Sequence, residues 1–309
     1  MVTTAFVLSG GGSLGSVQVG MLLALAESGV TPDFIVGTSV GAINAAYVAG
    51  HPGLDGVRSL AEIWSGLSRR DVFPTDPLRL VRVAARREPG FANPGPLRRL
   101  LERHLGYEQI EDADCSLTVV ATEVATGREV HIGRGDVADA VMASAALPGV
   151  FPPVQVGAHL LMDGGVVNNT PISAAVAHGA DVVYVLPTGY ACALPHAPRS
   201  PVGMAMHAVT VAIQQRLIAD VQALQDVVTL RVAPPLCPLA VSPVDFSHTV
   251  ELVQRAREST LGWLDQPAAA DQSRHLRLHS HRHEGSHREG FSSADPAPRN
   301  SIPGTAEEH

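Results

Sequence analysis

Apolar positions along the first 50 residues change from the pattern of a buried strand to the period of a helix, and they do so twice. Short apolar runs at 3–8 and 34–36 predict buried strands. Each run is followed by apolar residues three or four positions apart, which predicts a helix. These helical positions are Val17, Met21, Leu22 and Leu25 after the first run, and Val40, Ile43 and Tyr47 after the second. The order predicts two parallel strands, each followed by a helix.

Similar patterns continue along the chain as far as residue 264. Helices are expected at 51–67, 96–105, 136–146, 171–178, 201–225 and 246–264. Strands are expected at 117–121, 129–132, 154–156, 159–162, 181–186 and 227–232. Turn residues at 125–128 and 157–158 predict that two pairs of these strands form hairpins.

Two segments lack this periodicity. Residues 69–106 are rich in proline and arginine, and we interpret most of them as a solvated connection. The alternatives are a flap over the site and an arginine face for anionic head groups. From Gln266 onward the chain is polar and rich in histidine, so we expect 1–265 to form one domain and 266–309 a disordered tail. Metal binding by that tail is the alternative.

Composition narrows the class of protein. With 309 residues, 45% hydrophobic and 17% charged, the chain is long and apolar enough for a sizeable core. A net charge of -8 disfavours nucleic acid as a partner. Cys115, Cys192 and Cys237 are too few and too widely spaced for a disulfide framework or a zinc site, and we expect no metal and no cofactor.

The chain also shows no signal peptide and no run of about 20 apolar residues. We therefore expect a cytoplasmic protein, or one that contacts a membrane only from its surface.

A candidate nucleophile lies where the second predicted strand meets its helix. Gly37-Thr38-Ser39-Val40-Gly41 is a G-x-S-x-G motif, and its position on a strand-to-helix turn is the context that such a nucleophile requires. Gly37 and Gly41 would allow strained backbone angles and close approach of neighbouring segments. An ordinary tight turn is the alternative interpretation.

The glycines after the first strand supply candidate hydrogen-bond donors. Right-handed connections place the loops after both parallel strands at one edge of the sheet, so we expect Gly10, Gly11 and Gly12 to lie beside Ser39. Their N–H groups, just ahead of a helix, could stabilise an oxyanion. Gly10-x-Gly12-x-x-Gly15 is also a dinucleotide-binding pattern, but the acidic residue that should end the second strand is missing.

A serine nucleophile needs a base, and the residues leave two kinds open. Late histidines are one possibility; they are His178, His196, His207 and His248. The other is Asp163, which follows a predicted strand and precedes Gly164 and Gly165. A carboxylate can accept the serine proton directly if it lies within about 3 Å of the hydroxyl. An Asp in that role should be desolvated, with a raised pKa.

Together these motifs resemble the patatin-like phospholipase family. The resemblance rests on the loop at 10–15, the G-x-S-x-G at 37–41, the block SAALPGVFPP at 144–153 and Asp163-Gly164-Gly165, in the family's order. It implies a three-layer α/β/α fold with a mainly parallel central sheet and hydrolysis of acyl esters of lipids. Carried over, Ser39 is the nucleophile, Asp163 the base of a Ser-Asp dyad, and the glycine loop the oxyanion hole.

One position departs from the family. Its glycine loop commonly has Arg or Lys before the last glycine, where this chain has Leu14, so packing of Leu14 is expected to hold the loop instead. The prediction is a serine acyl hydrolase acting on a lipid or other acyl ester. The alternative on the same fold is a lipid-binding protein without catalysis.

Overall fold

The computed structural model describes residues 2–74, 90–189, 197–237, 239 and 241–266. The predictions for the tail, for His196 and Cys192, and for the arginines between 75 and 89 lie outside the described residues.

Eight strands and ten α-helices are described in these ranges, and most lie within a few residues of the predicted positions. The strands are β1 (Thr4–Leu8), β2 (Phe34–Thr38), β3 (Ser116–Glu123), β4 (Glu129–Ile132), β5 (Val154–Val156), β6 (His159–Asp163), β7 (Val182–Leu186) and β8 (Thr229–Val232). The helices are α1 (Gly15–Glu27), α2 (Val40–Gly50), α3 (Leu54–Gly66), α4 (Arg69–Val72), α6 (Gly95–His104), α7 (Val137–Ser144), α8 (Gly165–Asn168), α9 (Ile172–Ala177), α10 (Pro201–Leu224) and α11 (Thr249–Leu264). Two 3-10 turns complete them, η1 (Gly12–Leu14) and η2 (Ile110–Asp112).

All eight strands belong to one sheet, in the order β5-β6-β3-β2-β1-β7-β8, with β4 also paired to β3. The five strands from β3 to β8 in that order are parallel to one another. The predicted hairpins β3–β4 and β5–β6 are confirmed, and they make one side of the sheet antiparallel.

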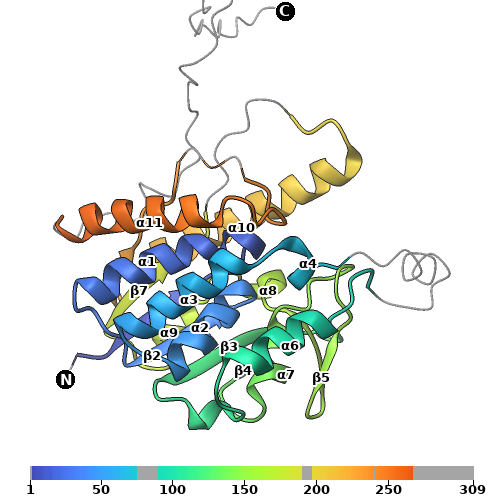
Figure 1. Cartoon of the computed structure of the whole chain (residues 1–309), viewed down its shortest axis with the longest axis horizontal. Helices are drawn as coiled ribbons and strands as arrows, with labels where there is room; N and C mark the ends of the chain where they lie inside the picture. Colours follow the sequence, from blue (N-terminus) through green and yellow to red (C-terminus); the bar gives the residue numbers. More distant parts are fainter. Residues whose placement is uncertain (1, 75–89, 190–196, 238, 240, 267–309) are drawn as a thin grey trace, which may run out of the picture.

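Helices cover both faces of this sheet, so the predicted three-layer α/β/α fold is confirmed. Alternate side chains of β1 face opposite layers: Phe6 and Leu8 join the larger core, and Ala5 and Val7 the smaller. The larger core includes α1, α2, α3, α7 and α11, and the smaller one α9 and α10. Figure 1 shows α11 lying along α1, while the first part of α10 projects from the layers.

Strand register decides which residues meet at the edge where the parallel strands end. Leu8 pairs with Gly37 on β2 and with Leu186 on β7. Two positions further along, the same alignment brings Gly10, Ser39 and Thr188 to one edge. The loops after β1 and β2 are therefore neighbours, as predicted.

Two helix starts and two short helices differ from the predictions. Helix α3 begins at Leu54, three residues later than expected. The last helix begins at Thr249, three residues later than expected, because the Asp245 side chain accepts hydrogen bonds from the N–H and hydroxyl of Ser247 and forms a turn there. The short helices α4 and α8 were not predicted, since four residues carry too little periodicity to be recognised.

Within the described ranges, the helices are either too short or too polar to span a lipid bilayer.

Candidate active site

Ser39 has a backbone conformation that few residues adopt. Its φ of 56° and ψ of −124° make it the only non-glycine residue with positive φ in the described part of the chain. Such a conformation costs about 1–3 kcal/mol and persists only where the surroundings enforce it. A methyl group at Gly41 would lie 2.2 Å from Leu8 O, and one at Gly37 would lie 2.6 Å from Gly41 O. The strain therefore lies on the serine, and the two glycines provide the room around it.

The Ser39 hydroxyl is hydrogen bonded to the carboxylate of Asp163. Ser39 Oγ donates to Asp163 Oδ2 over 2.7 Å. The Gly165 N–H donates to the other carboxylate oxygen, Oδ1, also over 2.7 Å. Asp163 ends β6, and its backbone carbonyl accepts from Thr122 Oγ1 on the neighbouring strand β3. Sheet pairing on one side and α8 on the other thus fix the carboxylate against the serine.

Burial changes the acidity of that carboxylate. Asp163 is only 3% exposed. Desolvation disfavours its charged form and raises its pKa from 3.8 to about 6, although the hydrogen bonds from Ser39 and Gly165 act in the opposite direction. The raised pKa agrees with the expectation for an Asp that must act as a base. It remains low enough for the carboxylate to be charged at neutral pH.

Ser144 joins the turn at Ser39 to the Asp163-Gly164-Gly165 motif. Its Oγ accepts from the Ser39 N–H over 2.8 Å and donates to Val120 O on β3. Its carbonyl accepts from the Gly164 N–H. A methyl group at Gly164 would lie 2.2 Å from Val120 O, so the close approach expected for this glycine is observed. Sequence reasoning assigns Ser144 no role of its own beyond membership of the SAALPGVFPP block.

The glycine loop lies directly against the nucleophile. A methyl group at Gly10 would be 3.1 Å from Ser39 Cβ. The Gly10 N–H, however, donates to the Asn169 carbonyl over 3.0 Å, and that donor is not free for an oxyanion, unlike in the prediction. The Gly11 and Gly12 N–H groups have no hydrogen-bond acceptor among the described residues. These two donors are the ones left for a ligand.

The family commonly has Arg or Lys where this chain has Leu14, and here other segments hold the glycine loop. The Ser13 N–H donates to Pro243 O over 2.8 Å, and Ser13 Oγ donates to Ser242 O over 3.0 Å. Thr188 Oγ1 donates to Gly10 O over 2.7 Å. Leu14 is partly buried against the larger core, as expected from its apolar side chain. The loop is therefore fixed by the segments before α11 and after β7, together with packing of Leu14.

Buried amides lie behind the loop and the turn. Gln18 Nε2 donates to Ser9 O and Leu186 O, at the ends of β1 and β7. Asn44 Nδ2 donates to Gly15 O and to Gln18 Oε1, and Asn44 Oδ1 accepts from Trp64 Nε1. Gly15 allows this close packing, because a methyl group there would lie 2.4 Å from Val40 Cγ2. These contacts join α1, α2 and α3 to the edge that carries Ser39.

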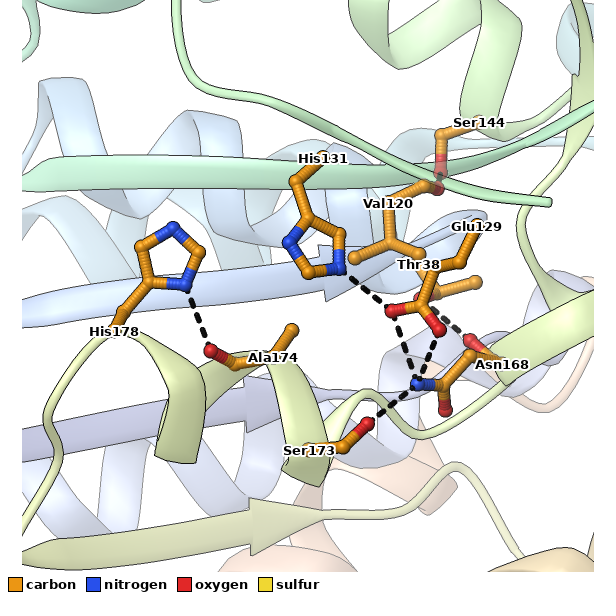
Figure 2. A network of polar contacts seen from close by, with 9 residues as sticks. All are labelled: Thr38, Val120, Glu129, His131, Ser144, Asn168, Ser173, Ala174 and His178. Carbon is orange, nitrogen blue, oxygen red and sulfur yellow. Dashed lines mark hydrogen bonds and ion pairs between the residues drawn. The ribbon is translucent and has the colours of Figure 1, made fainter.

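A second polar network holds α8 against the hairpin, as Figure 2 shows. Asn168 Nδ2 donates to both carboxylate oxygens of Glu129 and to Ser173 Oγ, each over 3.1 Å. The backbone carbonyl of Asn168 accepts from Thr38 Oγ1, next to Ser39. Burial alone would raise the pKa of Glu129, but hydrogen bonds from His131 and Asn168 outweigh burial and hold it below its usual value. α8 therefore rests on a charged carboxylate.

The histidines of the described ranges take no part in the hydrogen bonds around Ser39. Among the described histidines, none is hydrogen bonded to Ser39 or Asp163. His178 contacts the Ala174 carbonyl on α9, and His248 lies near Asp245 and Glu251 at the start of α11. Of the two kinds of base that the sequence left open, the structure brings only the carboxylate of Asp163 to the serine within the described ranges.

Comparisons with known proteins identify a family and several relatives. The family model described as patatin-like phospholipase matches residues 6–176. An uncharacterized NTE family protein of Mycobacterium tuberculosis is 34% identical over 166 residues, which cover 53% of this chain and 27% of that protein. Patatin-like phospholipase domain-containing protein 7 of Rattus norvegicus is 34% identical over 188 residues, covering 60% of this chain and 13% of that protein.

The chain thus spans about a quarter or less of the length of these relatives. Among solved structures, VipD from Legionella pneumophila has a TM-score of 0.44 and 17% identity, covering 85% of this chain and 67% of that one.

Proposed function

The chain belongs to the patatin-like phospholipase family, and we propose that it is a serine acyl hydrolase that cleaves acyl esters of lipids, with Ser39 as nucleophile and Asp163 as base. One observation carries this proposal. The strained turn presents the Ser39 hydroxyl at 2.7 Å from a buried carboxylate whose pKa is raised to about 6. A carboxylate at this distance and basicity suits general-base catalysis at neutral pH.

In the acylation step, Ser39 Oγ attacks the ester carbonyl carbon while its proton passes to Asp163 Oδ2. Negative charge then develops on the carbonyl oxygen, and the unpaired N–H groups of Gly11 and Gly12 are the proposed donors to it. When the carbon–oxygen bond breaks, Asp163 returns the proton to the departing alcohol. The acyl group remains on Ser39 as an ester.

Deacylation repeats these transfers with water. Asp163, again a carboxylate, takes a proton from the water molecule that attacks the acyl carbon. Collapse of the second oxyanion breaks the bond to Ser39 Oγ, which regains a proton from Asp163. The products are a carboxylic acid, an alcohol and the original enzyme, without any cofactor.

The proposal is tested with a fluorophosphonate probe and with hydrolysis of p-nitrophenyl esters and a panel of phospholipids. Wild type should be labelled and should hydrolyse at least one ester. Ser39→Ala should lose both properties, because Ser39 carries the only hydroxyl bonded to the Asp163 carboxylate among the described residues. The matched control is Ser65→Ala, on the exposed side of α3, where the hydroxyl contacts only the Glu62 carbonyl.

Retained hydrolysis in Ser39→Ala would rule out this nucleophile, provided that thermal unfolding shows the variant to be folded. Wild type that binds lipid vesicles but hydrolyses no ester would favour the lipid-binding alternative. Contact with a membrane surface is part of the proposal only for lipid substrates, and vesicle sedimentation measures it separately.

A further inference from the structure

A cavity of about 300 Å³ lies between α8 and α10, next to the candidate active site. Its apolar lining is contributed by Val166 and Val167 on α8 and by Val209, Ala212, Ile213 and Leu217 on α10. Pockets that bind small ligands are concave, mostly apolar and of about this volume or larger. The cavity therefore has the size and the lining of a site for an apolar ligand.

The side chains at the cavity mouth are exposed although they are apolar. Val166 is 55% exposed and Val209 is 54% exposed. The first 15 residues of α10, 201–215, contain no Asp, Glu, Lys or Arg. Charge appears only at the next turn of the helix, where Arg216 and Asp220 form an ion pair of 2.8 Å at the cavity wall. Because that pair neutralises itself, the cavity offers no unpaired charge to a polar head group.

Two residues line the cavity and also contact the catalytic groups. The Gly165 N–H donates to Asp163 Oδ1. Asn169 accepts from the Gly10 N–H, and a methyl group at Gly10 would lie 2.5 Å from Asn169 Oδ1 and 3.1 Å from Ser39 Cβ. Gly165 and Asn169 thus lie between the cavity and the groups around Ser39, so that the cavity adjoins the Ser39–Asp163 pair.

We propose that the cavity between α8 and α10 binds the acyl chain of the substrate and sets the chain length that the enzyme prefers. This inference rests on the proposed hydrolase function. A cavity of about 150 Å³ holds benzene, with six carbons, so about 300 Å³ suits an acyl chain of roughly eight to twelve carbons. Ala212 is the specificity-determining residue that this inference singles out, because a larger side chain there fills the space without disturbing the dyad.

The test compares kcat/KM for p-nitrophenyl acetate, hexanoate, decanoate and palmitate between wild type and Ala212→Phe. In wild type, kcat/KM should rise by about fourfold for each methylene that enters the cavity, up to decanoate. In Ala212→Phe, the phenyl ring replaces about half of that space, so decanoate hydrolysis should fall by at least about thirtyfold. Acetate hydrolysis should stay within about twofold of wild type.

The matched control is Ala223→Phe, an exposed alanine three helical turns further along α10 that does not line the cavity. Its chain-length profile should equal that of wild type. An equal loss for acetate and decanoate in Ala212→Phe, or no loss for either, would overturn the inference while leaving the Ser39 mechanism intact.

Calorimetric binding of decanoic acid provides a readout that needs no turnover. Wild type should bind decanoic acid and Ala212→Phe should bind it at least about tenfold more weakly. If no ester is hydrolysed but this difference is observed, the proposed hydrolase function fails and the cavity assignment stands. Equal binding by both proteins would remove the assignment.

Discussion

The two faces of the sheet differ in how completely their polar groups are hydrogen bonded and their apolar side chains are buried. On the face covered by α1, α2 and α3, the amides of Gln18 and Asn44 are fully buried and bonded to one another, to backbone carbonyls and to Trp64. On the face covered by α8 and α10, Val166 and Val209 are more than half exposed beside a cavity.

This difference separates two requirements of a hydrolytic site. A serine with a strained backbone needs rigid surroundings. Buried, fully hydrogen-bonded amides are rigid, because breaking any one of their bonds leaves another buried group unpaired. A substrate needs room, and the loosely covered face supplies it. Substitutions confined to one face at a time test this division.

Removing the amide at position 44 should cause the largest loss of stability. Asn44→Ala leaves Gln18 Oε1 and Trp64 Nε1 without their partners and removes one of the hydrogen bonds to Gly15 O. Each unpaired buried group costs about 1–3 kcal/mol, so we expect the free energy of unfolding to fall by about 4 kcal/mol. Urea denaturation followed by circular dichroism measures it.

The matched control for this variant is Asn93→Ala, in which an exposed Asn loses a single bond to the Gly95 N–H. It should cost less than about 1 kcal/mol. Similar losses for Asn44→Ala and Asn93→Ala would mean that the amide network contributes little, and that the contrast between the two faces is not energetic.

The buried carboxylate should reduce stability at neutral pH. The pKa of Asp163 is about 6 in the folded chain, against 3.8 as its ordinary value. Between these values the folded state binds more protons than the unfolded state, so stability falls as pH rises through this window and the loss is complete above pH 6. The shift corresponds to about 3 kcal/mol. Asp163→Asn should therefore be more stable than wild type at pH 8, by about 2 kcal/mol once imperfect hydrogen bonding of the amide is included, and by much less at pH 4.

Asp71→Asn is the control, because the contribution of Asp71 to stability should change with pH in the opposite direction. Hydrogen bonds from Ser68 hold the pKa of Asp71 below its usual value, so its contribution is present at neutral pH and lost as pH falls. Urea denaturation midpoints of wild type, Asp163→Asn and Asp71→Asn at pH 4, 6 and 8 measure both pH dependences. A difference between wild type and Asp163→Asn that does not change with pH would contradict the burial argument.

Local sequence patterns predict the main groups of the candidate site, which are Ser39, the glycine loop and Asp163. A G-x-S-x-G on a strand-to-helix turn predicts Ser39, and the handedness of the connection predicts the neighbouring glycine loop. A motif after a strand makes Asp163 one of two kinds of candidate base, and the family resemblance favours it. The structure brings all three together. Predicted helices and strands lie within a few residues of those observed because their apolar periods are long enough to be unambiguous.

Contacts between single polar residues far apart in the chain were not predictable. Ser144 bonds the Ser39 N–H across 105 positions, and Asn169 bonds the glycine loop across 159. Neither lies in a periodic pattern that specifies its partner. Gln18 and Asn44 did leave a signal, since each places an amide inside an otherwise apolar helix, but that signal shows only that a partner is needed. For the same reason the sequence could not tell that Gly10 donates to Asn169.

The pH dependence of catalysis should follow the same carboxylate. Because Asp163 must be ionised to accept the proton, log kcat/KM should fall with unit slope below its pKa of about 6. Each further pH unit then lowers kcat/KM about tenfold. Ester hydrolysis between pH 4.5 and 8.5, followed at the isosbestic wavelength of nitrophenol, measures this acid limb of the pH profile of kcat/KM. A limb at or below about 4 would mean that Asp163 is not desolvated in the reacting enzyme.

The smallest expected effect on stability comes from the open face. Val209→Ala removes two methyl groups that are already more than half exposed, and alanine favours a helix slightly more than valine does. The free energy of unfolding should change by less than about 0.5 kcal/mol. Val185→Ala, on β7 and completely buried, should cost about 2 kcal/mol by contrast.

If α8 and α10 are loosely covered in order to admit an acyl chain, the order of these two variants reverses when chain-length preference is measured. Val209→Ala should then change the ratio of decanoate to acetate hydrolysis, because Val209 lines the cavity. Val185→Ala should leave that ratio unchanged, because its side chain lies in the smaller core and not at the cavity. An unchanged ratio in both variants would mean that the exposed valines are merely tolerated surface residues, and the contrast between the faces would then concern stability alone.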